Sequence, residues 1–309
     1  METSIIWVTG VTGFIGVNLA RSLSGAGAIV IGFGNRERGD IGLDMGCLNG
    51  YYSGGLAAES LKQAAEAHGV PEKIYHLAGG ATVGGSFSDP YGDFEKNVVS
   101  SARILNFMQA HAPKADLYMS SSAAIFGDGY AGEIKTDDAL NPLSPYGAHK
   151  VAVENMAKIY AQTYDLKITI VRLFSVYGRE LKKQLLWDAC SRLKAGESLL
   201  RLGGTGQERR DWCHITDIVR YFQTVPAPER GQLQIKNAGS SIVTTVETLA
   251  ALLVKYWPEP VSATFSGERR AGDPFSLLCA PDSNFSFDWS MSVEDGVADY
   301  VDWFLSLDH

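Results

Sequence analysis

The sequence predicts an α/β protein built on a doubly wound parallel sheet, with a smaller C-terminal part interleaved with it. Three observations predict this fold class. Short apolar runs typical of buried strands recur through residues 1–173. Amphipathic helical patterns separate these runs, and strands that alternate with helices indicate a parallel sheet. A glycine-rich turn joins the first apolar run to the first helical pattern.

The composition is that of a globular protein and argues against several classes of partner. The 309 residues suffice for one large domain or two intimate ones, and 45% of them are hydrophobic. A net charge of 27 − 35 = −8 gives no electrostatic support for a nucleic-acid partner. The four cysteines lack metal-ligand spacing, so we expect no metal and a reducing compartment. We expect no membrane span and no signal peptide, and therefore a cytoplasmic protein.

The predicted elements follow the chain in order. A strand is expected over residues 4–8, a helix over 14–24 and a strand over 28–32. Further strands are expected over 73–78, 117–121 and 167–173, and helices over 91–111 and 145–164. Later residues predict a helix ending near 195, a strand at 199–202, a helix near 215–222, a strand near 234–237, and helices near 244–256 and 292–305.

The first turn carries the glycine pattern of a dinucleotide site. Gly10 permits a tight turn, Gly13 lets the backbone approach a pyrophosphate, and Gly16 lets the helix pack on the strand. The phosphates would lie at the helix N-terminus, where unpaired N–H groups favour anions. The sequence therefore predicts a Rossmann unit whose cofactor contacts include Gly10, Thr12, Gly13, Phe14, Ile15 and Gly16.

The end of the second predicted strand bears on the choice of cofactor. An NAD-binding protein usually has an acid here for the ribose 2′-hydroxyl, but this chain has Gly34. Asn35 and Arg36 follow, and a guanidinium suits a 2′-phosphate. These residues favour NADP, with NAD as the alternative.

Tyr146 and Lys150 are four residues apart on a predicted helix, and so lie on one face of it. An ammonium at that distance favours the phenolate and is expected to lower the pKa of the tyrosine. The pair predicts an acid–base group that works near neutral pH.

With these motifs and the Ser122 strand end in view, the chain resembles the extended short-chain dehydrogenase/reductase family. The resemblance is closest to the nucleotide-sugar epimerase, dehydratase and reductase branch. It implies that Ser122 assists catalysis, that Tyr146 is the general acid–base, and that Lys150 also binds the nicotinamide ribose. Residues 1–173 would be the dinucleotide-binding domain, and 174–309 mainly the substrate-binding part, with about 211–257 returning to the Rossmann sheet.

The resemblance also assigns residues around the cofactor and the substrate. It implies that Asp44 and Met45 line the adenine, that Ala78 lies along the cofactor, and that Asn97 supports the site. It implies that Arg210, together with Arg269 or Arg270, binds the diphosphate of a nucleotide-linked sugar. Ser175 stands where many members have asparagine, at a position expected to contact the substrate. The helices at 91–111 and 145–164 are those expected to pair in a homodimer.

Departures from the family narrow the chemistry. Ala123 and Ala124 replace the two acids that 4,6-dehydratases carry after the serine, which argues against dehydration. Enolising epimerisation lacks a cysteine near Ser122, and His149 is expected on another helix face than Lys150. The main hypothesis is an NADP-dependent reductase of a 4-keto sugar nucleotide. The alternative is a nucleotide-sugar 4-epimerase with tightly bound NAD(P). A non-catalytic NADP-sensing regulator is disfavoured, because the catalytic residue types are retained.

Overall fold

The computed structural model describes residues 4–37, 46–80, 82–269 and 274–307. The chain forms two compact units, which we describe separately. The first comprises Met1–Gly127, Ala139–Arg172 and Phe222–Lys236, and the second comprises Asp128–Asp138, Leu173–Tyr221 and Asn237–His309. The functional domains expected from the sequence, residues 1–173 and 174–309, stay a prediction.

The first unit carries the elements of the dinucleotide-binding prediction. In chain order they are β1 (Ile5–Thr9), α1 (Phe14–Gly25), β2 (Ile29–Phe33), β3 (Gly50–Tyr52), α2 (Ala58–His68), β4 (Lys73–His76), α3 (Val83–Ser88), α4 (Pro90–Phe94), the π-helical turn η2 (Glu95–Val99), α5 (Ser100–His111), β5 (Asp116–Ser122), the 3₁₀ turn η3 (Ala123–Ile125), α6 (Pro145–Tyr164), β6 (Lys167–Leu173) and β10 (Leu233–Ala238).

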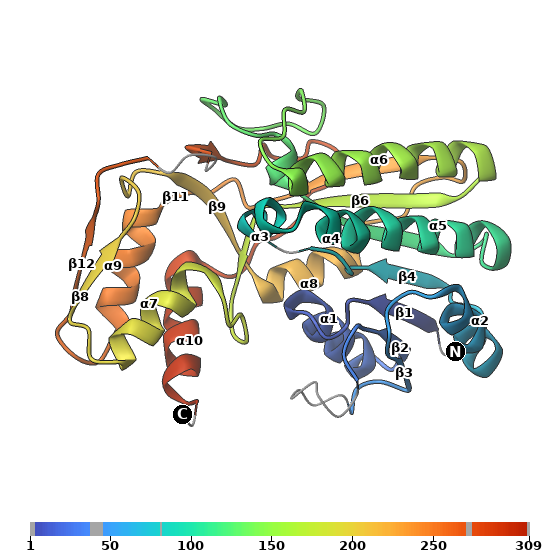
Figure 1. The fold of residues 1–309 in the computed structure, drawn as a ribbon, viewed down its shortest axis with the longest axis horizontal. Helices are drawn as coiled ribbons and strands as arrows, with labels where there is room; N and C mark the ends of the chain where they lie inside the picture. The colour runs from blue at the N-terminus through green and yellow to red at the C-terminus, as the bar shows by residue number, and fades with distance from the viewer. Residues whose placement is uncertain (1–3, 38–45, 81, 270–273, 308–309) are drawn as a thin grey trace. The chain divides into compact units, whose positions relative to one another are not determined.

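The strands of this unit form a seven-stranded sheet in the order β10-β6-β5-β4-β1-β2-β3. β1 pairs in parallel with β2 and β4, and β5 continues the parallel pairing beyond β4. The order reverses between β1 and β4, which is where open α/β sheets bind ligands at the carboxyl ends of their strands. The predicted doubly wound Rossmann fold is confirmed (Figure 1).

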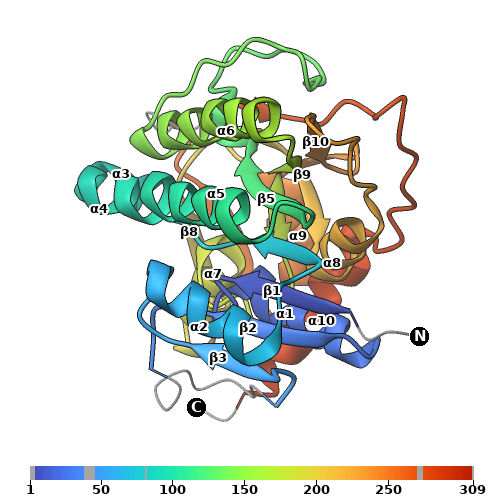
Figure 2. The ribbon, with the colours of Figure 1, turned by 90° about the vertical axis from the view of Figure 1, so that its right-hand side faces the viewer.

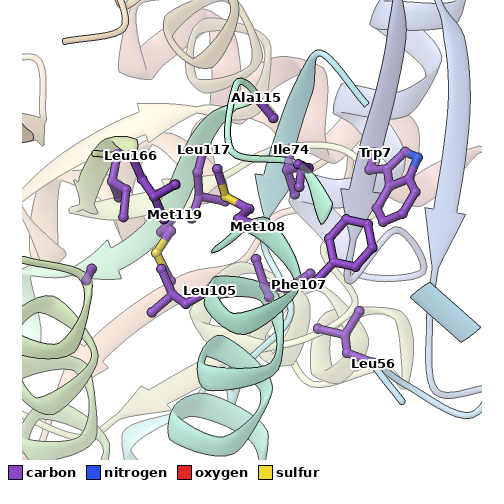
Figure 3. Packing of buried hydrophobic residues seen from close by; sticks show 14 of the residues in the cluster. Trp7, Leu56, Ile74, Leu105, Phe107, Met108, Ala115, Leu117, Met119 and Leu166 are labelled. Atoms are coloured by element: carbon purple, nitrogen blue, oxygen red, sulfur yellow. The ribbon is translucent and has the colours of Figure 1, made fainter. Parts of the chain in front are cut away.

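One face of the sheet is covered by α2, α5 and α6 through a continuous apolar cluster. The rings of Trp7 on β1 and Phe107 on α5 stack with centroids 4.9 Å apart, and Figure 3 shows them side by side. Ile74, Leu117 and Met119 bring β4 and β5 into the same cluster (Figure 3). This packing holds α5 and α6 against the sheet, and both helices run beside each other in Figures 1 and 2.

The predicted helix over 91–111 is interrupted in the structure. It is built as α4, η2 and α5, so a π-helical turn separates two α-helical segments. Side chains bond back to carbonyls here: Asn97 Nδ2 donates to the Asp93 carbonyl, and the Ser101 hydroxyl donates to the Asn97 carbonyl. Such bonds compete with regular helical ones. The apolar period did not reveal this turn because it reports which side is buried, not the local backbone pattern.

The second unit holds the remaining elements. They are β7 (Ser175–Tyr177), α7 (Gln184–Lys194), β8 (Leu199–Leu202), β9 (Arg209–His214), α8 (Ile215–Thr224, whose last residues belong to the first unit), β11 (Val243–Thr245), α9 (Val246–Tyr256), β12 (Ser262–Phe265), β13 (Ser276–Leu277) and α10 (Val293–Leu305). β9 pairs with β11, β13 and β7 along its length, and β8 pairs with β12. Helices α7, α9 and α10 are grouped near β8 and β12 (Figure 1).

No helix among the described residues is long and apolar enough to cross a membrane. In the same part of the chain, no group of three or more His, Cys, Asp or Glu side chains is arranged to hold a metal ion. Cys190, Cys213 and Cys279 are buried.

Candidate active site

The turn between β1 and α1 is formed by the predicted glycines, and each lies in a tight contact. Gly10 has φ +66°, and a Cβ there would lie 2.7 Å from the backbone nitrogen of Ala78. A Cβ at Gly16 would collide with the Gly10 carbonyl oxygen. The Gly13 N–H donates to that same carbonyl at 2.9 Å. The turn is therefore closed on itself, and Ala78 lies directly against it.

The N-terminus of α1 fits a pyrophosphate. Gly13 is the N-cap, and among the described residues no side chain caps the helix start. Gly13 is exposed, and Thr12, Phe14 and Ile15 are partly exposed. Unpaired N–H groups at such an end bind anions. The glycine contacts and the open helix start together show that these residues fit a dinucleotide.

Gly34, where an NAD-binding protein usually has an acid after β2, is packed against the side chain of Tyr51. A Cβ at Gly34 would lie 2.5 Å from the Tyr51 hydroxyl and 2.9 Å from Thr12 Cγ2. That hydroxyl donates to the Arg36 carbonyl at 2.6 Å. Asn35 and Arg36 are exposed. The adenine-lining predictions Asp44 and Met45 lie outside the described residues.

Tyr146 and Ser122 are brought together by close packing at the start of α6. Ser144 caps the helix, and its hydroxyl accepts from the Gly147 N–H at 3.1 Å. A Cβ at Gly147 would lie 2.8 Å from the Ala124 carbonyl oxygen, so α6 begins directly against η3. The Tyr146 side chain hydrogen-bonds the Ser122 hydroxyl, which also accepts from the Ala124 N–H at 3.2 Å.

Lys150 lies one turn along α6, as its spacing predicts. Its ammonium is 5.7 Å from the centroid of the Tyr146 ring and donates to the Ser120 carbonyl at 3.1 Å. The structure thus brings Ser122, Tyr146 and Lys150 together at the carboxyl end of β5.

The expected lowering of the tyrosine pKa is not what the structure shows. Burial raises the pKa of Tyr146 to about 12, although the hydrogen bond from Ser122 opposes that increase. Burial also lowers the pKa of Lys150 to about 8. The expectation that the pKa of Tyr146 is lowered was wrong. It considered the charge of the neighbouring lysine but not the burial of both side chains, which is the larger effect.

A buried histidine that the sequence analysis did not assign lies behind this site. His76 Nδ1 is 2.8 Å from the Thr9 hydroxyl, and His76 Nε2 is 3.0 Å from the Ser101 hydroxyl. Burial, with a smaller contribution from Lys150, lowers the pKa of His76 to about 3. The Thr9 hydroxyl also accepts from the Ala78 N–H at 3.2 Å, so a neutral imidazole ties β1, β4 and α5 behind the cofactor turn.

Asn97 lies in η2, and its side chain is buried against Gly79. A Cβ at Gly79 would lie 2.7 Å from Asn97 Oδ1 and 3.3 Å from Lys150 Nζ. Asn97 Oδ1 is buried without a hydrogen-bond partner among the described residues. Because a buried carbonyl oxygen without a partner is costly, this atom is suited to accept a donor from a bound ligand.

In the second unit, the two predicted arginine motifs meet at Phe275. The Phe275 carbonyl accepts from the Arg209 N–H at 2.8 Å and from Arg210 Nη1 at 3.3 Å. The Arg269 guanidinium lies over the Phe275 ring, with Cζ 5.1 Å from its centroid. Arg269 Nη2 also donates to Asp128 at 3.0 Å. The structure thus brings together motifs about sixty residues apart.

Two further substrate predictions fall in or near this unit. Ser175 lies on β7, and the pairing register places it opposite Trp212 on β9, the strand that carries Arg210. Arg210 is buried within β9, a strand that was not among those expected from the sequence. Arg270 lies outside the described residues.

Comparison with known proteins identifies the family of the chain. A family model described as "NAD dependent epimerase/dehydratase family" matches residues 6–235. A "Probable UDP-glucuronate 4-epimerase" of Rhizobium meliloti is 29% identical over 96% of each chain. A "UDP-glucose 4-epimerase" of Azospirillum brasilense is 27% identical over 90% of this chain and 84% of its own.

Solved structures share the fold. The UDP-glucose 4-epimerase of Thermus thermophilus, in complex with NAD, has a TM-score of 0.84 and 23% identity, covering 98% of this chain and 99% of its own. MoeE5 in complex with UDP-glucuronic acid and NAD has a TM-score of 0.84 and 23% identity, covering 97% and 98%.

Proposed function

Because the chain belongs to the NAD-dependent epimerase/dehydratase family, and is therefore an enzyme of the extended short-chain dehydrogenase/reductase type, we propose that it is a nucleotide-sugar 4-epimerase. The observation that carries the proposal is the cluster of Ser122, Tyr146 and Lys150 beside the glycine turn. The named relatives support epimerisation over the reductase that the sequence favoured.

The residues would act as follows. NAD(P), when bound, supplies a reversible hydride acceptor. Tyr146 takes the proton of the C4 hydroxyl while that carbon is oxidised, and returns it when the carbonyl is reduced on its other face. Ser122 holds the C4 oxygen and the phenol in one hydrogen-bonded array. Lys150 would hold the nicotinamide ribose, near Asn97.

The two residues that follow Ser122 are not the acids that a dehydration would require. Ala123 and Ala124 form the first residues of η3, immediately after Ser122. Their methyl side chains offer neither a proton nor a base for removing a hydroxyl. The reaction class that remains is hydride transfer at C4 without elimination.

The diphosphate of the substrate is assigned to the second unit. Arg210 and Arg269 converge on Phe275, and guanidinium groups bind phosphate oxygens through paired hydrogen bonds. Relatives act on or bind UDP-sugars, so we take a UDP-hexose or UDP-hexuronate as the substrate class.

Either dinucleotide is compatible with the general NAD(P) assignment. The absence of an acid at Gly34, together with Arg36, supports NADP. The relatives of known structure hold NAD. Denaturing release of the bound dinucleotide from the purified protein, followed by chromatography against NAD⁺ and NADP⁺ standards, identifies the one retained.

We also propose a homodimer through the helices of the first unit. Exposed apolar side chains on α3, α4 and α6 support it, with Phe87 57%, Tyr91 71% and Ile159 59% exposed. Sedimentation of the wild type should give a dimer, and Ile159→Glu should give a monomer. Val70→Glu, at a residue 52% exposed outside these helices, is the matched control. A monomeric wild type at micromolar concentration overturns the dimer.

The epimerase assignment is tested by product analysis. The purified chain is supplied with NAD⁺ or NADP⁺ and with UDP-glucose or UDP-glucuronate, and C4 epimers are separated by chromatography. We expect interconversion from either epimer without net cofactor reduction, and loss of turnover in Tyr146→Phe. Stoichiometric consumption of NADPH by a 4-keto sugar nucleotide, with no interconversion of hexoses, would instead establish the reductase.

A further inference from the structure

A contact between a buried aspartate and a partly buried histidine lies one residue from the lysine of the candidate active site. His149 Nδ1 is 2.7 Å from Asp93 Oδ2, and the side chains are 18% and 6% exposed. The His149 ring packs edge-on against Phe94, with centroids 5.6 Å apart. A carboxylate buried to this extent requires groups that compensate its charge.

The other carboxylate oxygen of Asp93 faces the cluster that contains Lys150. A Cβ at Gly80 would collide with Asp93 Oδ1 and would lie 2.9 Å from Asn97 Nδ2. At Gly79, the neighbouring residue, a Cβ would lie close to both Asn97 Oδ1 and Lys150 Nζ. Asp93, Asn97 and Lys150 are thus packed around two consecutive glycines at the end of β4.

Asp93 also acts on both titrating groups of the site. Burial raises the pKa of Tyr146, and the Asp93 carboxylate adds to that increase. Burial lowers the pKa of Lys150, and the same carboxylate opposes that decrease. An unbalanced negative charge at Asp93 would therefore make the phenolate of Tyr146 harder to form.

We propose that Asp93 and His149 are a positioning pair, in which the His149 ring holds the Asp93 carboxylate in place beside Tyr146 and Lys150. The pair touches neither reacting atom and acts through the two residues that do. It rests on the proposed function only in assigning Tyr146 the acid–base role.

Other ionisable groups around this cluster have partners or lie at the surface. Glu154 on α6 is paired with Arg172 of β6 at 2.7 Å. His76 of β4 is held neutral by burial. Glu95 and Lys96 of η2 are exposed. Asp93 and Glu154 both raise the pKa of Lys150, and of these two carboxylates Glu154 is compensated by Arg172.

The test measures Lys150 directly in the full-length protein without substrate. The Cε resonance of Lys150 in ¹³C-lysine-labelled protein is identified by its loss in Lys150→Met and followed against pH. Asp93→Asn should move its midpoint to lower pH by roughly one pH unit, because a nearby anion is removed. His149→Gln should move it to higher pH, because the carboxylate loses the imidazole that holds it in place. The double variant should match Asp93→Asn, because His149 acts only through the Asp93 carboxylate.

A matched control lies at the far end of the same helix. Asp165 follows α6 and pairs with Arg230 at 2.7 Å, so Asp165→Asn removes an exposed ion pair by the same substitution. It should leave the Lys150 midpoint unchanged. If Asp93→Asn and His149→Gln lower only the melting temperature and leave that midpoint in place, the pair is structural bracing and the proposal is overturned.

The pH dependence of turnover provides the second readout. With an active substrate, the basic shift in His149→Gln and the acidic shift in Asp93→Asn should appear in the limb of kcat/KM assigned to Tyr146, with opposite signs. The two failures are distinguishable. If no sugar nucleotide is turned over but Lys150 titrates as described, the proposed function fails and the positioning pair stands.

Discussion

Glu154 of α6 and Arg172 of β6 are joined by two hydrogen bonds inside the first unit, from Nε to Oε1 at 3.0 Å and from Nη2 to Oε2 at 2.7 Å. Their side chains are 5% and 3% exposed. The Arg172 guanidinium also lies over the Phe126 ring, 5.1 Å from its centroid. The pair therefore connects the helix that carries Tyr146 to the sheet and to the segment after η3.

Glu154→Gln should lower the free energy of unfolding by about 3–5 kcal/mol, because it leaves a buried guanidinium without its counter-charge. Urea unfolding provides the measurement. The pair of Arg192 and Glu197, whose side chains are 29% and 34% exposed, offers a more exposed control, and Glu197→Gln should change stability little. The double variant Glu154→Gln/Arg172→Met should recover part of the loss. Equal effects of the buried and exposed substitutions would contradict this account.

Two glycines of α1 should respond oppositely to alanine. Gly16→Ala places a methyl group against the Gly10 carbonyl, so it should destabilise the protein and weaken dinucleotide binding. Gly25→Ala meets no atom within 4 Å and should stabilise by about 0.5–1 kcal/mol through lower chain entropy when unfolded. The melting temperature without NAD(P) measures the effect on stability, and its increase when NAD(P) is added measures the effect on dinucleotide binding.

His76 should make stability pH-dependent on the acid side. Its pKa is lowered from 6.5 to about 3, so between these values the unfolded chain binds a proton that the folded chain does not. Stability is therefore complete above about pH 6.5 and is lost as the pH falls toward 3, by about 1.4 kcal/mol per pH unit.

The check is the slope of unfolding free energy between pH 6 and pH 4. His76→Gln should reduce this slope, whatever its effect on stability at pH 7. His111→Gln, at an exposed position, serves for comparison. An unchanged slope in His76→Gln would show that other groups set the acid sensitivity.

Removing the phenol should cost more than removing its serine partner. Tyr146→Phe should lower kcat by about 10²- to 10⁴-fold, the usual contribution of a general acid–base group. Ser122→Ala should cost less, because the phenol remains and only the hydrogen bond that opposes its raised pKa is lost. Steady-state kinetics and circular dichroism of both variants test this. Full activity in Tyr146→Phe would remove the tyrosine from the mechanism.

Arg210 should matter for binding more than for turnover. If Arg210 binds the diphosphate as proposed, Arg210→Met should raise KM by about 10- to 100-fold, with a smaller change in kcat. Arg201→Met, at an exposed position on β8, is the control. A KM effect of equal size in both variants would indicate general electrostatic attraction instead.

The sequence predicted the sheet and the core of the site because their signals are local. A strand was expected at each strand of the first unit except β3, and the predicted strand over 167–173 matches β6 at both ends. The glycine turn was recognisable because its spacing follows from backbone contacts between Gly10, Gly13 and Gly16. The pair of Tyr146 and Lys150 follows from helical periodicity alone.

The elements that were missed depend on distant partners. β9 contains consecutive charged residues and was not among the strands expected from the sequence. In the structure Asp211 is fully buried, and its carboxylate accepts from the N–H groups of Ser240 and Ser241 at 2.8 Å. Likewise, nothing near Asp93 in the sequence indicates His149, its partner 56 residues later. Such compensation is visible only once the chain is folded.

The π-helical turn η2 changes the directions in which the side chains of α4 and α5 point relative to each other. A π turn holds one more residue than an α turn, and each residue advances an α-helix by about 100°. Asp93 and Asn97, on α4 and η2, are therefore turned by about 100° relative to Ile104 and Met108 on α5, compared with their positions in one continuous α-helix. Deleting one residue of η2 would put the two sides back into a common register. The side with Asp93 and Asn97 or the side with Ile104 and Met108 would then keep its present contacts, but not both.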